Sequence, residues 1–168
     1  MLAQVKVEDK STEITALPDL VCQVAMKGCM VTIDAMGCQW DIAEQIVAQE
    51  ADYVLALKAT QPDLLEEVVD CFTQAEADAY HEVGRTMTET ITKGHGRLEL
   101  RRHTGLTEPT YLAWLQEVQH WPGLQALGRV EAERRLGEEQ TREVRYYLLS
   151  RAMSASAFAQ AVRKPLGH

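Results

Sequence analysis

Asp34 is the residue whose type and position point most directly to chemistry. It follows the β-branched run 31–33, which favours a buried strand, and it precedes Ala35 and Gly37, which suit a turn. In open α/β sheets, functional side chains gather beyond the carboxyl ends of the strands. The Asp34 carboxylate therefore either accepts hydrogen bonds from backbone N–H groups in a turn or binds a divalent cation such as Mg²⁺. A two-metal site needs several converging carboxylates, so Asp34 alone does not form one.

The segment 93–102, KGHGRLELRR, is the one strongly basic stretch, with four Lys or Arg against a single Glu. On a strand, Arg97 and Arg101 share one face with Glu99, and the two leucines share the other. Such a strand is either a solvated face of a sheet or an edge that contacts phosphates. In the second interpretation the candidate DNA-binding residues are Lys93, His95, Arg97, Arg101 and Arg102.

Composition sets the background for these two features. The chain has 168 residues, 46% of them hydrophobic and 25% charged, and a formal net charge of −8. This composition is typical of a soluble globular protein, and the acidic balance argues against a surface that binds nucleic acid all over. No apolar stretch approaches the roughly 18 residues of a membrane helix, and the N-terminus lacks the pattern of a signal peptide. Cys22, Cys29, Cys38 and Cys71 form no CxxC pair, which indicates reduced thiols in a cytoplasmic protein.

The order of predicted elements indicates an α/β fold with an inserted β-rich segment. Strands are predicted at 2–7, 30–34 and 52–58, and they alternate with helices that start near Pro18, Asp41 and Pro62. This alternation predicts a parallel or mixed sheet covered by helices. Two hairpins follow, one around Lys93-Gly94 and one around Gly137, with a short helix at 111–118 between them and a last helix at 154–162. We therefore divide the chain into a core at 1–79, an insertion at 80–150 and the start of a final helix at 151–168.

Five blocks of sequence, in this order, resemble a known family. They are AQVKVEDKSTEITALPDLV (3–21), VTIDAMGCQWDIAEQIV (31–47), DYVLALKATQPDL (52–64), GHGRLELRR (94–102) and VRYYLLS (144–150). Together they are similar to the H-repeat-associated insertion-sequence transposases of the DDE superfamily. The similarity extends over nearly the whole chain, from about Ala3 to Arg163.

The resemblance implies a partial ribonuclease-H-like core, interrupted by a β-rich insertion, that transposes DNA by Mg²⁺-dependent phosphoryl transfer. It assigns Asp34 as the middle residue of the family's acidic triad. The first acid of the family lies in a strand upstream of Met1, and the third lies on the final helix beyond Arg163, where Lys164-Pro165 would break a helix. We therefore expect a catalytically inactive fragment, with weak or no binding of Mg²⁺ and of DNA.

The same resemblance predicts a homo-oligomer. In the family, two strands precede the one matched by 2–7, and without them this chain exposes a sheet edge that can pair with another chain.

Two other functions remain open at the level of the sequence. The chain can be a repurposed binding module that uses the 93–102 patch to contact protein or DNA without catalysis. Alternatively it can be an independent hydrolase in which Asp34 joins Asp41, Asp52 or Asp63, although capping of helices and strand starts also explains these three acids.

Overall fold

The computed structural model describes residues 4–7, 27–33, 40–57, 61–78 and 84–163. The helix predicted near Pro18 and the side chain of Asp34 lie outside these residues. Strands and helices are otherwise found where the periodicity predicts them.

The described strands form one seven-stranded sheet in the order β1-β2-β3-β7-β6-β5-β4. β1, β2 and β3 are parallel to one another, and the remaining pairs are antiparallel. The sheet is therefore mixed and the α/β class is confirmed. The strand bounds are β1 Gln4–Val7, β2 Met30–Ile33, β3 Asp52–Ala56, β4 Arg85–Gly94, β5 Arg97–Leu106, β6 Ala126–Leu136 and β7 Glu139–Leu149.

β3 is the central strand of the core, as its continuous apolar sequence predicts. It pairs with β2 on one side and with β7 on the other, where Val54 lies opposite Leu149 and Ala56 opposite Tyr147. Because β7 also pairs with β6, the predicted core at 1–79 and the predicted insertion at 80–150 contribute to a single sheet. Where one domain ends and the next begins stays a prediction.

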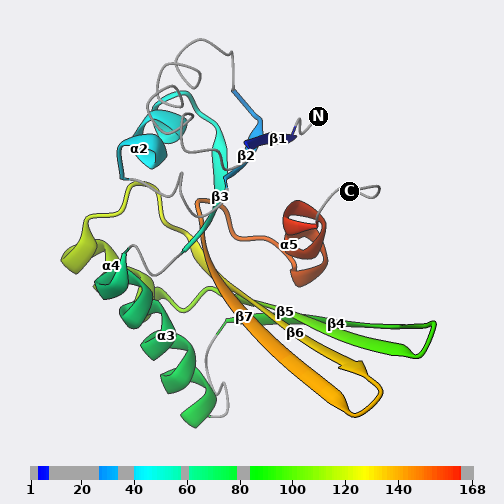
Figure 1. Cartoon of the computed structure of the whole chain (residues 1–168). Coiled ribbons are helices and arrows are strands. Elements are labelled where there is room, and N and C mark those ends of the chain that lie inside the picture. The colour runs from blue at the N-terminus through cyan, green and yellow to red at the C-terminus, as the bar shows by residue number, and fades with distance from the viewer. Residues whose placement is uncertain (1–3, 8–26, 34–39, 58–60, 79–83, 164–168) are drawn as a thin grey trace.

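Helices cover both faces of this sheet near its centre (Figure 1). α2 (Trp40–Ala48), α3 (Pro62–Ala77) and α4 (Pro109–Gln119) lie on one side, and α5 (Ala155–Val162) lies on the other. Tyr53 and Leu55 pack in the core on the first side, whereas Val54 and Ala56 pack with α5, as the alternation of a strand requires. We call these two sides the α3 face and the α5 face. None of the helices in the described residues is long and apolar enough to cross a membrane.

Local signals set the ends of several helices. Pro62 occupies the first turn of α3, and the Ser154 side chain accepts a hydrogen bond from the Ala157 N–H at 3.1 Å to cap α5. α4 starts at Pro109, two residues earlier than predicted, because Glu108 caps it by accepting a hydrogen bond from the Thr110 N–H at 3.3 Å.

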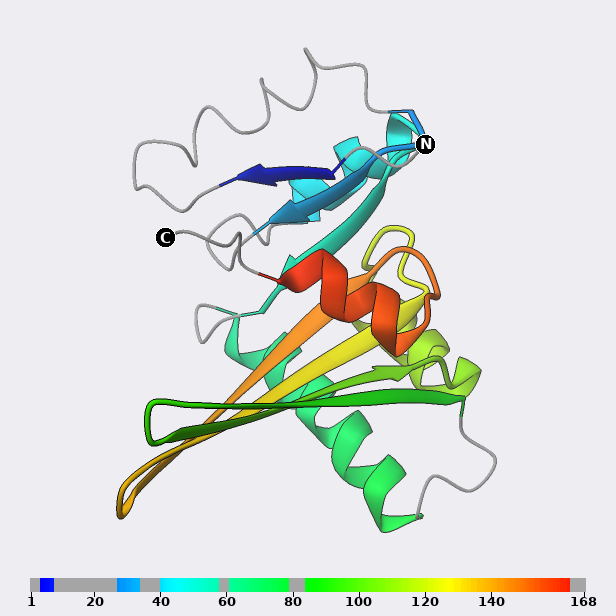
Figure 2. The same cartoon turned by 90° about the vertical axis from the view of Figure 1, so that its right-hand side faces the viewer.

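The two hairpins, residues 85–106 and 126–149, form four long strands that we call the arm, and the outer part of the arm extends beyond α5 (Figures 1 and 2). In its outer part, residues 90–101 and 132–143, every side chain is exposed or half-buried.

One predicted turn is wrong by two residues. The first hairpin turns at His95-Gly96, not at Lys93-Gly94, because both turn residues have positive φ, 49° and 75°, as a two-residue hairpin loop requires. The second hairpin turns at Gly137, φ 60°, as predicted.

Phe158 anchors α5 to the sheet. It is buried, and its ring meets the rings of Tyr147 and His103 edge to face at centroid distances of 5.4 and 5.9 Å. Gly128 lies beneath the ring, and a Cβ at this position would come within 2.5 Å of the Phe158 Cζ atom. Glycine is therefore required on β6 for the phenylalanine to pack.

We predict that Phe158→Ala lowers the free energy of unfolding by about 3–5 kcal/mol, because it leaves a cavity between α5 and the sheet. Urea denaturation measures the change. Trp114→Ala on α4 is the control, since Trp114 is 54% exposed and its loss should cost no more than about 0.5 kcal/mol. Equal effects of the two substitutions would contradict this role of Phe158.

Candidate nucleic-acid interface

The strand that precedes Asp34 ends where two other strands end. Ile33, the last residue of β2, is buried. It lies opposite Val7 of β1 on one side and opposite Leu55 of β3 on the other. Since these three strands are parallel, their carboxyl ends meet at one edge of the sheet. This is the edge at which α/β proteins place functional groups. The structure thus confirms the strand position from which Asp34 was inferred, whereas the role of Asp34 stays a prediction.

The last helix ends against the same strand (Figure 2). The Thr32 hydroxyl donates a hydrogen bond to the Ala161 carbonyl at 3.4 Å, and Met30 packs in the same apolar cluster as Val162. α5 therefore runs from its cap at Ser154 to a point beside the end of β2. From the family resemblance, the third acid of the triad is expected on the continuation of this helix.

In the part of the chain that the structure describes, no three Asp, Glu, His or Cys side chains gather to hold a metal ion. Asp41 and Asp63 lie in the first turns of α2 and α3, where acids stabilise helices. Asp52 lies opposite Met30, at the other end of β2 from Ile33, and accepts a hydrogen bond from the Ser150 hydroxyl at 3.1 Å. These positions favour structural roles for the three acids over the hydrolase hypothesis.

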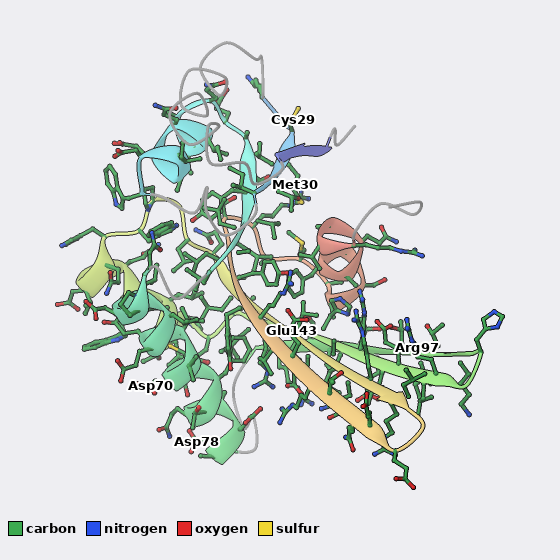
Figure 3. All side chains as sticks on the ribbon, viewed as in Figure 1. Cys29, Met30, Asp70, Asp78, Arg97 and Glu143 are labelled. Atoms are coloured by element: carbon green, nitrogen blue, oxygen red, sulfur yellow. The ribbon has the colours of Figure 1, made fainter. Side chains whose placement is uncertain are left out.

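The structure divides the predicted DNA-binding residues between two faces of the arm. Arg97 and Arg101 lie on the α5 face, and Lys93 and Arg102 lie on the α3 face. His95 lies in the turn between β4 and β5. Figure 3 shows Arg97 near the outer end of this hairpin. The five residues therefore do not form one continuous patch.

On the α3 face, glutamates hold the arginines. Arg102 contacts Glu89 at 2.6 Å and Glu131 at 3.5 Å, and the hydrogen bond to Glu89 is the main reason that the pKa of Arg102 is raised. Arg129 binds Glu131 at 2.9 Å and reaches Glu76 of α3 at 2.6 Å. The Arg129–Glu76 pair links the arm to α3. Glu89 and Glu131 largely offset the charge of Arg102.

On the α5 face, a shallow hollow of about 70 Å³ opens where the arm meets the end of α5. Three arginines from three strands, Arg101, Arg134 and Arg145, contribute to its wall. Arg101 donates a hydrogen bond from Nε to the Glu99 carboxylate, which also lies 3.5 Å from Arg134. Glu143 pairs with Arg145 at 2.8 Å. The other lining residues are His103, Val130, Ala132, Glu143, Tyr147 and Val162.

His103 lies at the inner side of this hollow and is buried against Phe158. Burial lowers its pKa, and the nearby Arg101 guanidinium lowers it further. The imidazole is therefore neutral at pH 7. It contributes a hydrogen-bonding group to the hollow but no charge.

Sequence reasoning missed Arg134 and Arg145. The turn at Gly137 could have shown that Arg134 and Arg145 share a face, because it fixes which residues of β6 and β7 lie opposite each other. The register between β5 and β6 could not be predicted in this way, because α4 separates these two strands in the chain.

Charge is unevenly distributed along the chain. The two hairpins, 85–106 and 126–149, contain ten Lys or Arg and seven Glu, which gives a charge of +3. Since the whole chain carries −8, the rest carries −11. The acidic total therefore conceals a locally basic arm.

Known proteins match this chain over almost all of its length. It is 37% identical over 167 residues to the "H repeat-associated putative transposase YhhI" of Escherichia coli K12, which covers 97% of this chain and 43% of that protein. It is 38% identical over 172 residues to the "Putative transposase YncI" of E. coli O157:H7, covering 97% of this chain and 41% of that protein. The chain belongs to the family of these H repeat-associated proteins. No protein-family model matches it.

A protein from outside E. coli is also similar to this chain. The "Uncharacterized protein in dhlA 3'region" of Xanthobacter autotrophicus is 39% identical over 150 residues, which covers 89% of this chain and 48% of that protein. The chain thus spans less than half the length of these relatives.

The burial of His103 predicts a loss of stability in acid. Its pKa is below the ordinary value of 6.5 in the folded chain, so the unfolded chain binds the proton more readily. The contribution is fully present above pH 6.5 and is lost as the pH falls below it. Urea denaturation at several pH values should show this loss, and His103→Gln should make it smaller. An unchanged pH dependence in that variant would contradict the assignment.

Proposed function

We propose that this chain is part of a DDE-type transposase, in which Asp34 is the middle acid of a ribonuclease-H-like core and the arm binds the DNA backbone. The observation that carries the proposal is the position of α5. One end of this helix contacts both β2, through Thr32, and the basic hollow, through Val162. A DNA strand in the hollow would thus lie close to the edge of the sheet at which β2 ends.

The metal chemistry of the proposal needs more than this chain's described residues. When bound by several acids, Mg²⁺ activates the attacking oxygen and stabilises the leaving oxygen of a phosphoryl transfer. The described residues do not assemble such a ligand set. We therefore assign no catalytic step to this chain alone and propose that by itself it does not cleave DNA.

The α5 face of the arm supports the DNA-binding part of the proposal better than the α3 face does. It presents Arg97 near its outer end and Arg101, Arg134 and Arg145 around the hollow. On the α3 face, Arg129 is buried in its pairs with Glu131 and with Glu76 of α3, and Arg102 pairs with Glu89 and Glu131. The pairs of Arg134 with Glu99 and of Arg145 with Glu143 on the α5 face are more exposed. Guanidinium groups contact phosphates in fixed directions, and such phosphate contacts carry no information about the base sequence. We thus propose binding to the backbone of DNA without sequence preference at this face.

We predict that Arg97→Gln/Arg134→Gln weakens binding to duplex DNA by about tenfold at low salt and reduces the slope of log affinity against log salt by about 1–2. Fluorescence anisotropy with a labelled duplex measures both quantities.

The matched control is Arg135→Gln/Arg142→Gln on the α3 face. It removes the same charge from exposed arm residues, one of which also pairs with a glutamate. The control should retain affinity to within about threefold. If both double variants lose affinity for DNA equally, DNA does not bind preferentially to the α5 face, and this part of the proposal is wrong.

A second experiment tests catalysis. We predict that the purified 168-residue chain, with Mg²⁺ and supercoiled plasmid, produces no nicked DNA above the level of Asp34→Ala. A single carboxylate binds Mg²⁺ too weakly to hold two ions. Nicking that requires Mg²⁺ and disappears in Asp34→Ala would show that the chain is active by itself.

A second candidate function is a non-catalytic binding module, which the separation of charge favours: the arm is basic and the rest of the chain is acidic. The two experiments distinguish these functions. A non-catalytic module binds DNA through the arm in the same way, so its DNA binding depends on the same arginines. It does not nick DNA, and Asp34→Ala therefore changes nothing in the nicking assay, even in a longer chain that includes the acids expected from the family.

A further inference from the structure

β4 forms a long free edge of the sheet. It has ten residues, Arg85–Gly94, and in the described residues it pairs only with β5. Every second N–H and C=O group along it therefore points away from the sheet. The opposite edge, β1, has only four residues. Of the two edges, β4 offers the longer row of unsatisfied backbone groups.

This edge also lacks most of the features that prevent strands from pairing. Its register with β5 is continuous over ten residue pairs, without a bulge, and it contains no proline. Ile91 and Met87, on the same side of the strand, are 62% and 46% exposed. A single lysine, Lys93, carries the positive charge that would discourage pairing at its outer end.

We propose that β4 pairs with β4 of a second copy of this chain, antiparallel and with Ile91 on the two-fold axis. Residues directly opposite each other in an antiparallel pair point to the same side of the sheet. A two-fold axis between identical strands must therefore pass beside a residue that faces its own copy. Ile91 is the most exposed large apolar residue among those that the structure describes.

This register places opposite charges next to each other. Two positions from Ile91 in either direction lie Glu89 and Lys93, so Glu89 faces Lys93 of the second copy and Lys93 faces its Glu89. On the other side of the sheet, Thr90 faces Thr92. Glu89 contacts Arg102 through Oε1, which leaves Oε2 as an acceptor for the lysine.

Neighbouring registers are less favourable. An axis at Glu89 places two glutamates together and sets Arg85 against Lys93, and an axis at Thr90 sets Glu89 against Ile91. An axis at Met87 also sets Arg85 against Glu89, but it leaves Ile91 and Lys93 without a partner on β4. The Ile91 register pairs the more exposed apolar residue and both Glu89 and Lys93, and only in this register does Lys93→Glu place like charges opposite each other. The result is a continuous sheet through two copies, with the hollow of each copy on the face that α5 covers.

Sedimentation equilibrium at micromolar concentrations tests the proposal with charge-exchange variants. The parent chain should be dimeric. Glu89→Lys and Lys93→Glu each place two like-charged pairs across the interface, and each should weaken the dimer by about tenfold or more. The double variant Glu89→Lys/Lys93→Glu restores opposite charges and should dimerise to within about threefold of the parent.

Arg135→Glu is the matched control, because it reverses an exposed charge on β6, away from the edge, and should leave the dimer unchanged. Circular dichroism shows that each variant is folded. A parent chain that is monomeric throughout this range overturns the proposal. So does a dimer that neither single variant weakens, since it must use another surface such as β1.

Discussion

The antiparallel pairing of β3 with β7 is the contact on which the rest of the structure depends. It joins three parallel strands to four antiparallel ones through three residue pairs, from Val54 and Leu149 to Ala56 and Tyr147. Since side chains alternate along both strands, this register determines which residues of β7 point toward α3 and which point toward α5. The same alternation passes through β6 to β5. The division of the arginines between the two faces of the arm follows from it.

The burial of the ion pairs then distinguishes the two faces. On the α3 face, Glu131 is buried and binds Arg129, Arg102 and Arg142, while Glu76 extends the network to α3. A buried carboxylate needs such partners, because an unpaired charge is costly in a region from which water is excluded. Arg129 and Arg102 are therefore part of the structure, whereas Arg142, whose side chain is 60% exposed, lies at the edge of the network. On the α5 face Glu99 and Glu143 also pair with the arginines, but these pairs are more exposed, and the arginines line an open hollow where an anionic ligand can reach them.

Short-range signals were enough to predict most elements, because proline, glycine and a capping serine act within a few residues. Pro62, Ser154 and Gly137 mark their helix starts and turn correctly. Contacts between distant segments were not predictable. Nothing in the local sequence shows that β7 returns to β3, or that Arg101 and Arg145 meet in one hollow. Strand alternation does separate Arg97 and Arg101 from Arg102 at the level of the sequence, but which of the two faces is covered by α3 and which by α5 depends on the pairing of β7 with β3.

The described outer part of the arm has no buried side chains, so it should unfold locally and tolerate substitution more readily than the centre of the sheet. There, cross-strand pairs and ladder hydrogen bonds are the main stabilising contacts, whereas the inner ends of β5, β6 and β7 are fixed by the packed interior. The hairpin tips can thus fray while the centre stays folded, as a separate cooperative unit of low stability. Substitutions at the tips leave both cores intact. The binding properties of the tips can accordingly diverge between related chains without a change in fold.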